Sequence, residues 1–188
     1  MIRVFSFALI TLACTLRAHA SIDFSPVTSE RKLSGFTFQQ LNFSHNGRRV
    51  TYEQPPGWSY SGGGPRIKFV PPSVTLAHSE IDQMPLSAPI TLDEDTKKVL
   101  QQRALASVPP DSQDVVLVAE MPDPVLVNNN HTYEVTVAYK AFGQEFMTGI
   151  VYLNLPDTQV RFRTVARKED FEKLHNAFRG SIFSWQWQ

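Results

Sequence analysis

Three consecutive stretches, residues 131–142, 144–155 and 158–167, constrain the fold more than any other part of the chain. The first and third alternate apolar with polar side chains, as in Val160-Arg161-Phe162-Arg163. A period of two places these sets on opposite faces of a β-strand. The middle stretch carries apolar residues on both faces, which is typical of a central strand. Short links at Gly143 and Pro156-Asp157 predict that the three strands form an antiparallel meander.

Two segments have helical spacing instead. Residues 91–108 begin with Thr91 and Glu94, which match a capping box, and end at Pro109-Pro110. The segment from residue 168 onward places apolar residues at intervals of three and four, which predicts an amphipathic helix. Its stripe consists of Phe171, Leu174, His175, Phe178 and Ile182.

The first half of the chain predicts four strands. Two of them flank Asn46-Gly47, a pair that accepts positive φ in a tight hairpin turn. Two more are expected at residues 66–70 and 74–83. Residues 21–34 lack periodicity and are interpreted as a polar lead-in. The order of four strands, helix, four strands, helix predicts one α+β domain over residues 35–188, with an antiparallel sheet and helices on both faces.

The stretch "EQPPGWSYSGGGPRIKF", residues 53–69, is rich in proline and glycine. Its glycines do not precede a helix, so they lack the amide nest and dipole of a phosphate-binding loop. We interpret the stretch as a connection between strands. Pro55-Pro56 end the first strand, Trp58 packs back onto the domain, and Gly62-Gly63-Gly64 allow the chain to reverse.

Residues 1–20 predict a signal peptide. Arg3 precedes an apolar run from Val4 to Ala13, and Ala18-His19-Ala20 supplies small residues for cleavage after Ala20. The run is too short to span a bilayer comfortably. The protein is therefore expected to be periplasmic or secreted. The alternative is a lipoprotein anchored through Cys14, although Thr11 stands where such signals usually carry leucine.

Composition excludes several functional classes. Cys14 is the one cysteine, so the chain after Ala20 has no disulfide, cysteine-bound zinc, iron–sulfur cluster or thiol nucleophile. Cleavage leaves 16 basic and 18 acidic residues, a net charge of −2. A charge this close to zero gives no electrostatic reason to expect nucleic-acid binding. Sequence motifs of serine hydrolases, zinc proteases, P-loop proteins and dinucleotide-binding proteins are missing from the sequence.

The chain resembles the PsbP-like superfamily over about residues 36–185. The resemblance rests on the opening hairpin running into "YEQPPGW" (residues 52–58), the mid-chain helix, the meander, and "RFRTVARKEDFEKLHNAFRGSIFSW" (residues 161–185). It implies an α-β-α sandwich. It also implies a domain that binds or stabilises other macromolecules, because the superfamily mostly acts in that way and shares no catalytic constellation.

Some side chains are candidates for chemistry. His78, Glu80 and Asp82 alternate along one strand, so they share a face and are a weak candidate for a metal site. A solvated strand face is the more common origin of such a pattern, because polar residues on an outward face need no special explanation. His175 lies in the apolar stripe of the last helix, where it is either a covered histidine or a general base.

Other side chains are candidates for an interaction surface. Arg161, Arg163 and Arg167 share one strand face and suit an anionic ligand or an acidic partner. They also fit the polar face of an ordinary strand. Trp58 and Tyr60 either anchor a partner or pack in the core.

These observations favour an exported, cofactor-free, non-enzymatic domain that binds a macromolecule of the envelope or exterior. The alternative is a hydrolase or metal-dependent enzyme that uses His78, Glu80 and Asp82, or His175 with a nearby carboxylate.

Overall fold

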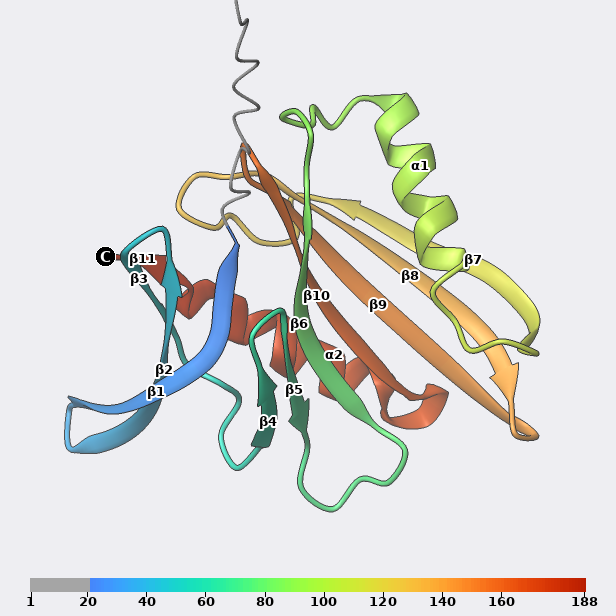
Figure 1. Ribbon diagram of the computed structural model, residues 1–188. Coiled ribbons are helices and arrows are strands. Elements are labelled where there is room, and N and C mark those ends of the chain that lie inside the picture. The colour runs from blue at the N-terminus through green and yellow to red at the C-terminus, as the bar shows by residue number, and fades with distance from the viewer. Residues whose placement is uncertain (1–20) are drawn as a thin grey trace, which may run out of the picture.

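The computed structural model describes residues 21–188, except for the side chains of Leu33 and Phe36. The expected signal peptide, with its cleavage site after Ala20, and Cys14 lie outside the described residues. Within residues 21–188, the strands form two antiparallel sheets, which Figure 1 shows side by side. The chain also contains two α-helices in these residues.

The larger sheet has seven strands in the order β4-β5-β6-β10-β9-β8-β7. The predicted meander is confirmed, because β9 pairs antiparallel with both β8 and β10. β9 is also covered on both faces, as expected, with Ile150 and Val151 both buried. The strands are β4 (Ser59–Gly63), β5 (Arg66–Val70), β6 (His78–Pro85), β7 (Gln113–Pro122), β8 (Thr132–Ala141), β9 (Gln144–Asn154) and β10 (Thr158–Arg167).

The smaller sheet has four strands in the order β1-β2-β3-β11. These are β1 (Ile22–Leu33), β2 (Phe36–His45), β3 (Arg48–Tyr52) and β11 (Gln186–Trp187). The hairpin predicted at Asn46-Gly47 is confirmed: it joins β2 to β3, and both turn residues have positive φ, 53° and 73°. β1 and β2 run beyond the end of β3 and form a projecting two-stranded arm (Figure 1).

The two helices are α1 (Glu94–Leu105) and α2 (Lys168–Ser181), and α2 continues into a short 3-10 helix, η1 (Ile182–Ser184). The expected capping box of α1 is wrong, because Asp93 caps the helix by accepting a hydrogen bond from the Thr96 amide. Asp93 is closer to the first turn than Thr91 and supplies the same kind of oxygen acceptor. Between residues 21 and 188, the helices are too short and too polar to cross a membrane.

The expected α+β sandwich with helices on both faces is wrong. Strands account for 53% of the described residues and helices for 17%, and these residues form two sheets. The small sheet shares one face of the large sheet with α2, which passes behind it in Figure 1. On the opposite face α1 is short and covers only the end near β8, where it buries Leu100 and Ala104. A second sheet therefore stands where a layer of helices was expected.

The polar lead-in expected at residues 21–34 is also wrong, because residues 22–33 form β1. Ile22 and Phe24 are buried in the main core, whereas most later side chains of β1 are exposed. These two apolar residues attach one end of the strand to the core. The projecting arm has no buried face over most of its length, so it produces no period-two signal in the sequence.

The main core is organised around Trp185, which directly follows η1. Its indole lies 5.3 Å from the Phe162 ring of the large sheet and 5.9 Å from the Phe43 ring of the small sheet. Phe24, Tyr52 and Trp187 also contact it. One side chain therefore joins both sheets to the end of α2.

We predict that Trp185→Ala lowers the free energy of unfolding by about 3–5 kcal/mol, because it opens a large cavity between the sheets. Urea denaturation measures the change. Phe183→Ala is the matched control: this aromatic lies two residues away, is 65% exposed, and should cost less than about 0.5 kcal/mol. Equal losses in the two variants would contradict the role assigned to Trp185.

Candidate functional site

A groove of about 880 Å³ lies between the projecting arm, the chain that follows β3, and the C-terminal end of α2. Its volume falls within the range of about 300–1,000 Å³ that is usual for ligand sites. Residues from distant parts of the sequence line it. They include Arg31, residues 37–40 of β2, residues 53–57, Ala177, Gly180, Ser181, Phe183, Ser184, Gln186 and Gln188.

The groove exists because β3 leaves the sheet early. The pairing of β2 with β3 ends at Leu41 of β2 and Tyr52 of β3. β2 extends beyond this last pair, toward its own first residue, Phe36. After Tyr52 the chain reaches Pro55-Pro56, which cannot donate the amide hydrogen bonds of a strand ladder. The Glu53 amide donates to the Ser184 hydroxyl and fixes the departing chain against η1.

A glycine in the opposite wall leaves space open in the groove. Gly180 lies in the last turn of α2, and a methyl group added there would meet no atom within 4 Å. Next to it, Phe183 lines the groove and leaves 65% of its surface exposed. An exposed aromatic ring beside an open cavity is a typical anchor point for a partner.

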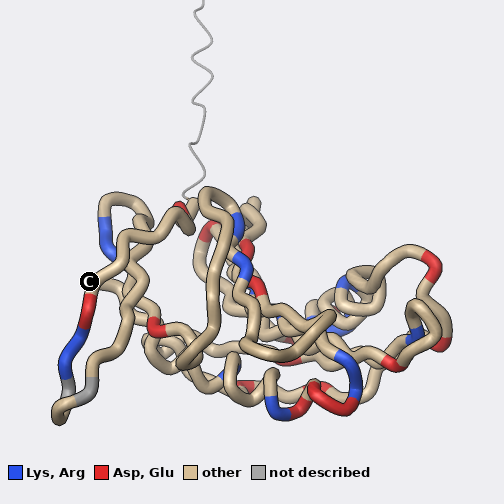
Figure 2. The backbone as a smooth tube through the Cα atoms, turned by 90° about the horizontal axis from the view of Figure 1, so that it is seen from below, with Lys and Arg blue, Asp and Glu red and all other residues tan. Residues whose placement is uncertain are grey.

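The charges that line the groove compensate one another. Arg31 donates two hydrogen bonds to the Glu53 carboxylate, at 2.5 and 3.0 Å, and its guanidinium lies 5.5 Å from the centre of the Phe38 ring. The hydrogen bonds and the charge of Glu53 raise the pKa of Arg31. Figure 2 shows basic and acidic residues interspersed along the described part of the chain. The groove thus presents amides and aromatic rings without a net charge.

The aromatic residues proposed from the sequence do not form this site. Trp58 is buried and stacks on Phe178 of α2, with ring centres 6.1 Å apart. Tyr60 packs against the same core. The aromatics that do line the groove are Phe38 and Phe183. Phe183 directly follows the apolar stripe of the last helix in the sequence, which is a weak signal for a functional residue. Only the position of the arm in the fold shows that Phe183 lines a groove.

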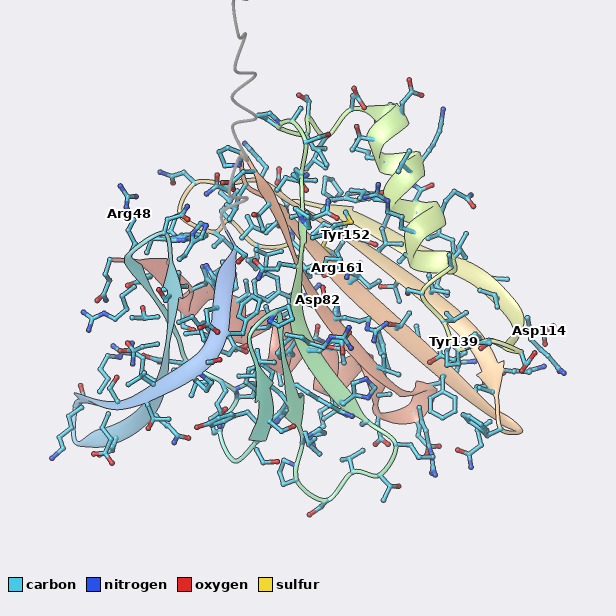
Figure 3. The ribbon with its side chains drawn as sticks, viewed as in Figure 1. Arg48, Asp82, Asp114, Tyr139, Tyr152 and Arg161 are labelled. Atoms are coloured by element: carbon cyan, nitrogen blue, oxygen red, sulfur yellow. The ribbon has the colours of Figure 1, made fainter. Side chains whose placement is uncertain are left out.

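The strand face with His78, Glu80 and Asp82 is neutralised by its neighbours. Arg161 forms two hydrogen bonds with Asp82, at 2.6 and 2.8 Å, and Arg163 lies 2.7 Å from Glu80. Across the other edge of β6, Arg66 stands opposite Asp82 and Lys68 opposite Glu80. Figure 3 shows Asp82 and Arg161 together at the centre of the large sheet, with Tyr152 nearby.

Each carboxylate therefore lies between two basic residues, a favourable cross-strand arrangement. Within the described residues, no three His, Cys, Asp or Glu side chains come together as metal ligands. Arg161 and Arg163 are engaged with these carboxylates, and Arg167 lies 3.7 Å from Glu169. The arginines proposed as a basic strip thus belong mainly to ion pairs within the sheet.

His175 belongs to a different, buried cluster. Its Nε2 lies 3.0 Å from the Glu134 carboxylate, which also accepts hydrogen bonds from Arg179. Burial raises the pKa of Glu134, but the hydrogen bond from His175 and the nearby charges outweigh it and lower the pKa overall. The imidazole stacks on Phe171, 4.9 Å away, and is 5% exposed. The structure thus brings His175 next to a carboxylate, inside the protein rather than in the groove.

Comparisons with known proteins add little. No protein-family model matches the sequence, and no curated protein does. Among solved structures, the chain is similar to a protein of unknown function, PA94 from Pseudomonas aeruginosa, at 11% identity and a TM-score of 0.47, over 84% of this chain and 94% of that one. A Bacteroides thetaiotaomicron VPI-5482 structure matches at 10% identity and a TM-score of 0.47, over 74% of this chain and 45% of that one. Neither likeness is close enough to bear on fold or function.

His78 makes stability depend on pH. Burial, together with the charges of Lys68 and Arg163, lowers its pKa to about 4, so the unfolded chain binds a proton that the folded protein does not. Stability that is present above the ordinary histidine pKa, about 6.5, is lost as the pH falls toward 4.

The free energy of unfolding should fall between pH 7 and pH 4.5, and we predict that His78→Gln makes this fall smaller by about 1–2 kcal/mol. The figure allows for the partial exposure of His78, and urea denaturation at the two pH values measures it. His131→Gln, at an exposed histidine that contacts Asp123, serves as the control. An unchanged difference in the His78 variant would show that this side chain does not resist protonation in the fold.

Two glycines provide a matched test of packing. A methyl group at Gly149 would come within 2.6–3.0 Å of the His175 ring, whereas one at Gly180 meets open space. Gly149→Ala should lower the free energy of unfolding by about 1–3 kcal/mol through overpacking. Gly180→Ala should raise it by about 0.5 kcal/mol through better helix propensity. Thermal or urea unfolding with the same sign for both variants would refute this description of the two sites.

Proposed function

We propose that this protein is an exported, non-enzymatic, cofactor-free binding domain that holds a macromolecular partner of the cell envelope or exterior in its groove. The observation that carries the proposal is the groove itself, with Phe183 exposed beside it. Its walls come from the arm, residues 53–57, and the end of α2.

The composition of the groove supports a binding role. Its aromatic rings offer apolar contact area, and its glutamine side chains offer both donors and acceptors of hydrogen bonds. The glutamines are Gln39, Gln40, Gln54, Gln186 and Gln188. Because Arg31 and Glu53 neutralise each other, the groove favours an uncharged ligand over the phosphate backbone of a nucleic acid.

Two expectations from the sequence support the same proposal. The predicted signal peptide places the domain outside the cytoplasm, where a partner would belong to the envelope or exterior. The resemblance to the PsbP-like superfamily stays a prediction. Its members mostly bind other macromolecules, which agrees in kind with a groove of this type.

Partner capture tests the proposal. Wild-type protein and two variants are used to recover partners from the exported fraction of the organism that encodes it. Phe183→Ala removes the exposed ring of the groove, whereas the control Phe142→Ala removes a ring that is 88% exposed in the turn between β8 and β9. We expect Phe183→Ala to weaken capture by at least about tenfold, in line with the loss of an aromatic anchor.

A second pair of variants tests the cavity rather than the ring. Gly180→Leu should fill the groove and abolish capture, and Gly180→Ala should leave it open. Capture that all four variants retain would refute binding in the groove. Circular dichroism and thermal unfolding establish that each variant is folded.

A further inference from the structure

One wall of the groove is an open edge of a β-strand. The pairs of β1 with β2 follow one register without interruption from Val27 and Asn42 to the turn between Leu33 and Phe36. The pairs of β2 with β3 stop at Leu41. Residues 37–40 of β2 therefore have a neighbouring strand on one side only, and the other side faces the groove.

The register shows which backbone groups are free. In an antiparallel ladder, alternate residues of a strand direct both their N–H and their C=O groups to the same neighbour. Two-residue turns at Ser34-Gly35 and Asn46-Gly47 make Phe36 a hydrogen-bonded partner of β1 and His45 one of β3. Even-numbered residues of β2 therefore bond to β1, and odd-numbered residues face the side of β3.

Thr37 and Gln39 thus direct their backbone groups into the groove. The residue that would continue β3 opposite Gln39 is Gln54, but this pair does not form, and the Gln54 side chain donates to the Trp58 carbonyl instead. Within residues 21–188, the register therefore leaves the Thr37 and Gln39 amides without a strand partner on the groove side, and no turn or loop hydrogen bond involves them. Unpaired donors and acceptors on an exposed strand are a template for another strand.

We propose that an extended, uncharged segment of a partner polypeptide adds to β2 beside Thr37 and Gln39, in the place that β3 vacates. This inference rests on the proposed function and names the chemistry of the partner. The main-chain hydrogen bonds supply affinity, and the Phe183 side chain packs against alternate side chains of the added strand.

The segment is uncharged because the groove has no free charge to receive one. Arg31 and Glu53, which flank the open edge, form two hydrogen bonds with each other. A charged peptide residue would lose its hydration beside this pair without gaining a partner.

Two other edges are less suitable. β7 has exposed apolar side chains, but its register shifts between Gln113 and Val116 and again between Leu117 and Ala119, and such irregularities disrupt strand pairing. The outer edge of the arm along β1 carries Glu30, Arg31 and Lys32, and charged residues discourage the addition of a strand.

The test begins with a random decapeptide library selected on the purified protein. The tightest uncharged peptide is then measured against Gln39→Ala and Gln39→Pro. Alanine retains the backbone N–H, whereas proline removes it on the side that faces the groove. Both variants lose the Gln39 side chain, so the difference between them isolates the backbone N–H. We expect Gln39→Pro to bind at least about tenfold more weakly than Gln39→Ala.

Amide hydrogen exchange of the wild-type protein provides a measurement that needs no variant. In the free protein the Thr37 and Gln39 amides should exchange quickly, and the Phe38 and Gln40 amides slowly. The bound peptide should slow exchange at Thr37 and Gln39 by at least about tenfold. Only every second amide of the added peptide faces β2. Methylation of those peptide nitrogens should abolish binding, whereas methylation of the other set should not.

The outcomes separate the two proposals. Binding that Gly180→Leu abolishes but Gln39→Pro retains, with unchanged exchange at Gln39, would overturn strand addition and leave the groove as the binding site. Binding that both variants retain would remove both proposals.

A dimer of the wild-type protein that Gln39→Pro dissociates would assign the edge to self-association and overturn the partner segment. If Gln39→Pro does not fold, the exchange rates decide.

Discussion

The contact of Trp185 with both sheets is the interaction on which the rest of the structure depends. Its indole lies between Phe162 of the large sheet and Phe43 of the small one, at the point where α2 and η1 end. Because the four-stranded sheet has its buried side chains on one face, it is stable only when that face is covered. Trp185 provides much of that cover and so fixes where the arm and the end of α2 lie relative to each other.

The groove follows from this arrangement and from one local constraint. Pro55-Pro56 prevent β3 from continuing along β2, while β1 and β2 extend further as an arm. The departing chain is fixed by the hydrogen bond from the Glu53 amide to Ser184. A short strand and a long hairpin in one sheet therefore leave a vacant place beside residues 37–40, with α2 and η1 as its other wall.

The polar side chains that were candidates for a catalytic or metal site are engaged in ion pairs and hydrogen bonds within the fold. Glu80 and Asp82 each lie between two basic residues of neighbouring strands. His175 and Glu134 form a buried hydrogen bond between α2 and β8. Removal of one member from such a buried group leaves another without a partner, which is costly. Their arrangement is explained by packing on the two faces of the large sheet.

The sequence by itself determined the meander, the Asn46-Gly47 hairpin and the helix of α2, because each depends on a short-range period or turn preference. It also identified Pro55-Pro56 as the end of a strand. It did not reveal β1, whose side chains are mostly exposed, or the second sheet, because the layer that covers a sheet depends on distant contacts. Only the tertiary structure decided that Phe38, Phe183 and Gly180 share a groove. Phe38 lies more than 100 positions from Gly180 and Phe183 in the sequence. No local pattern connects the free edge of β2 with the end of α2.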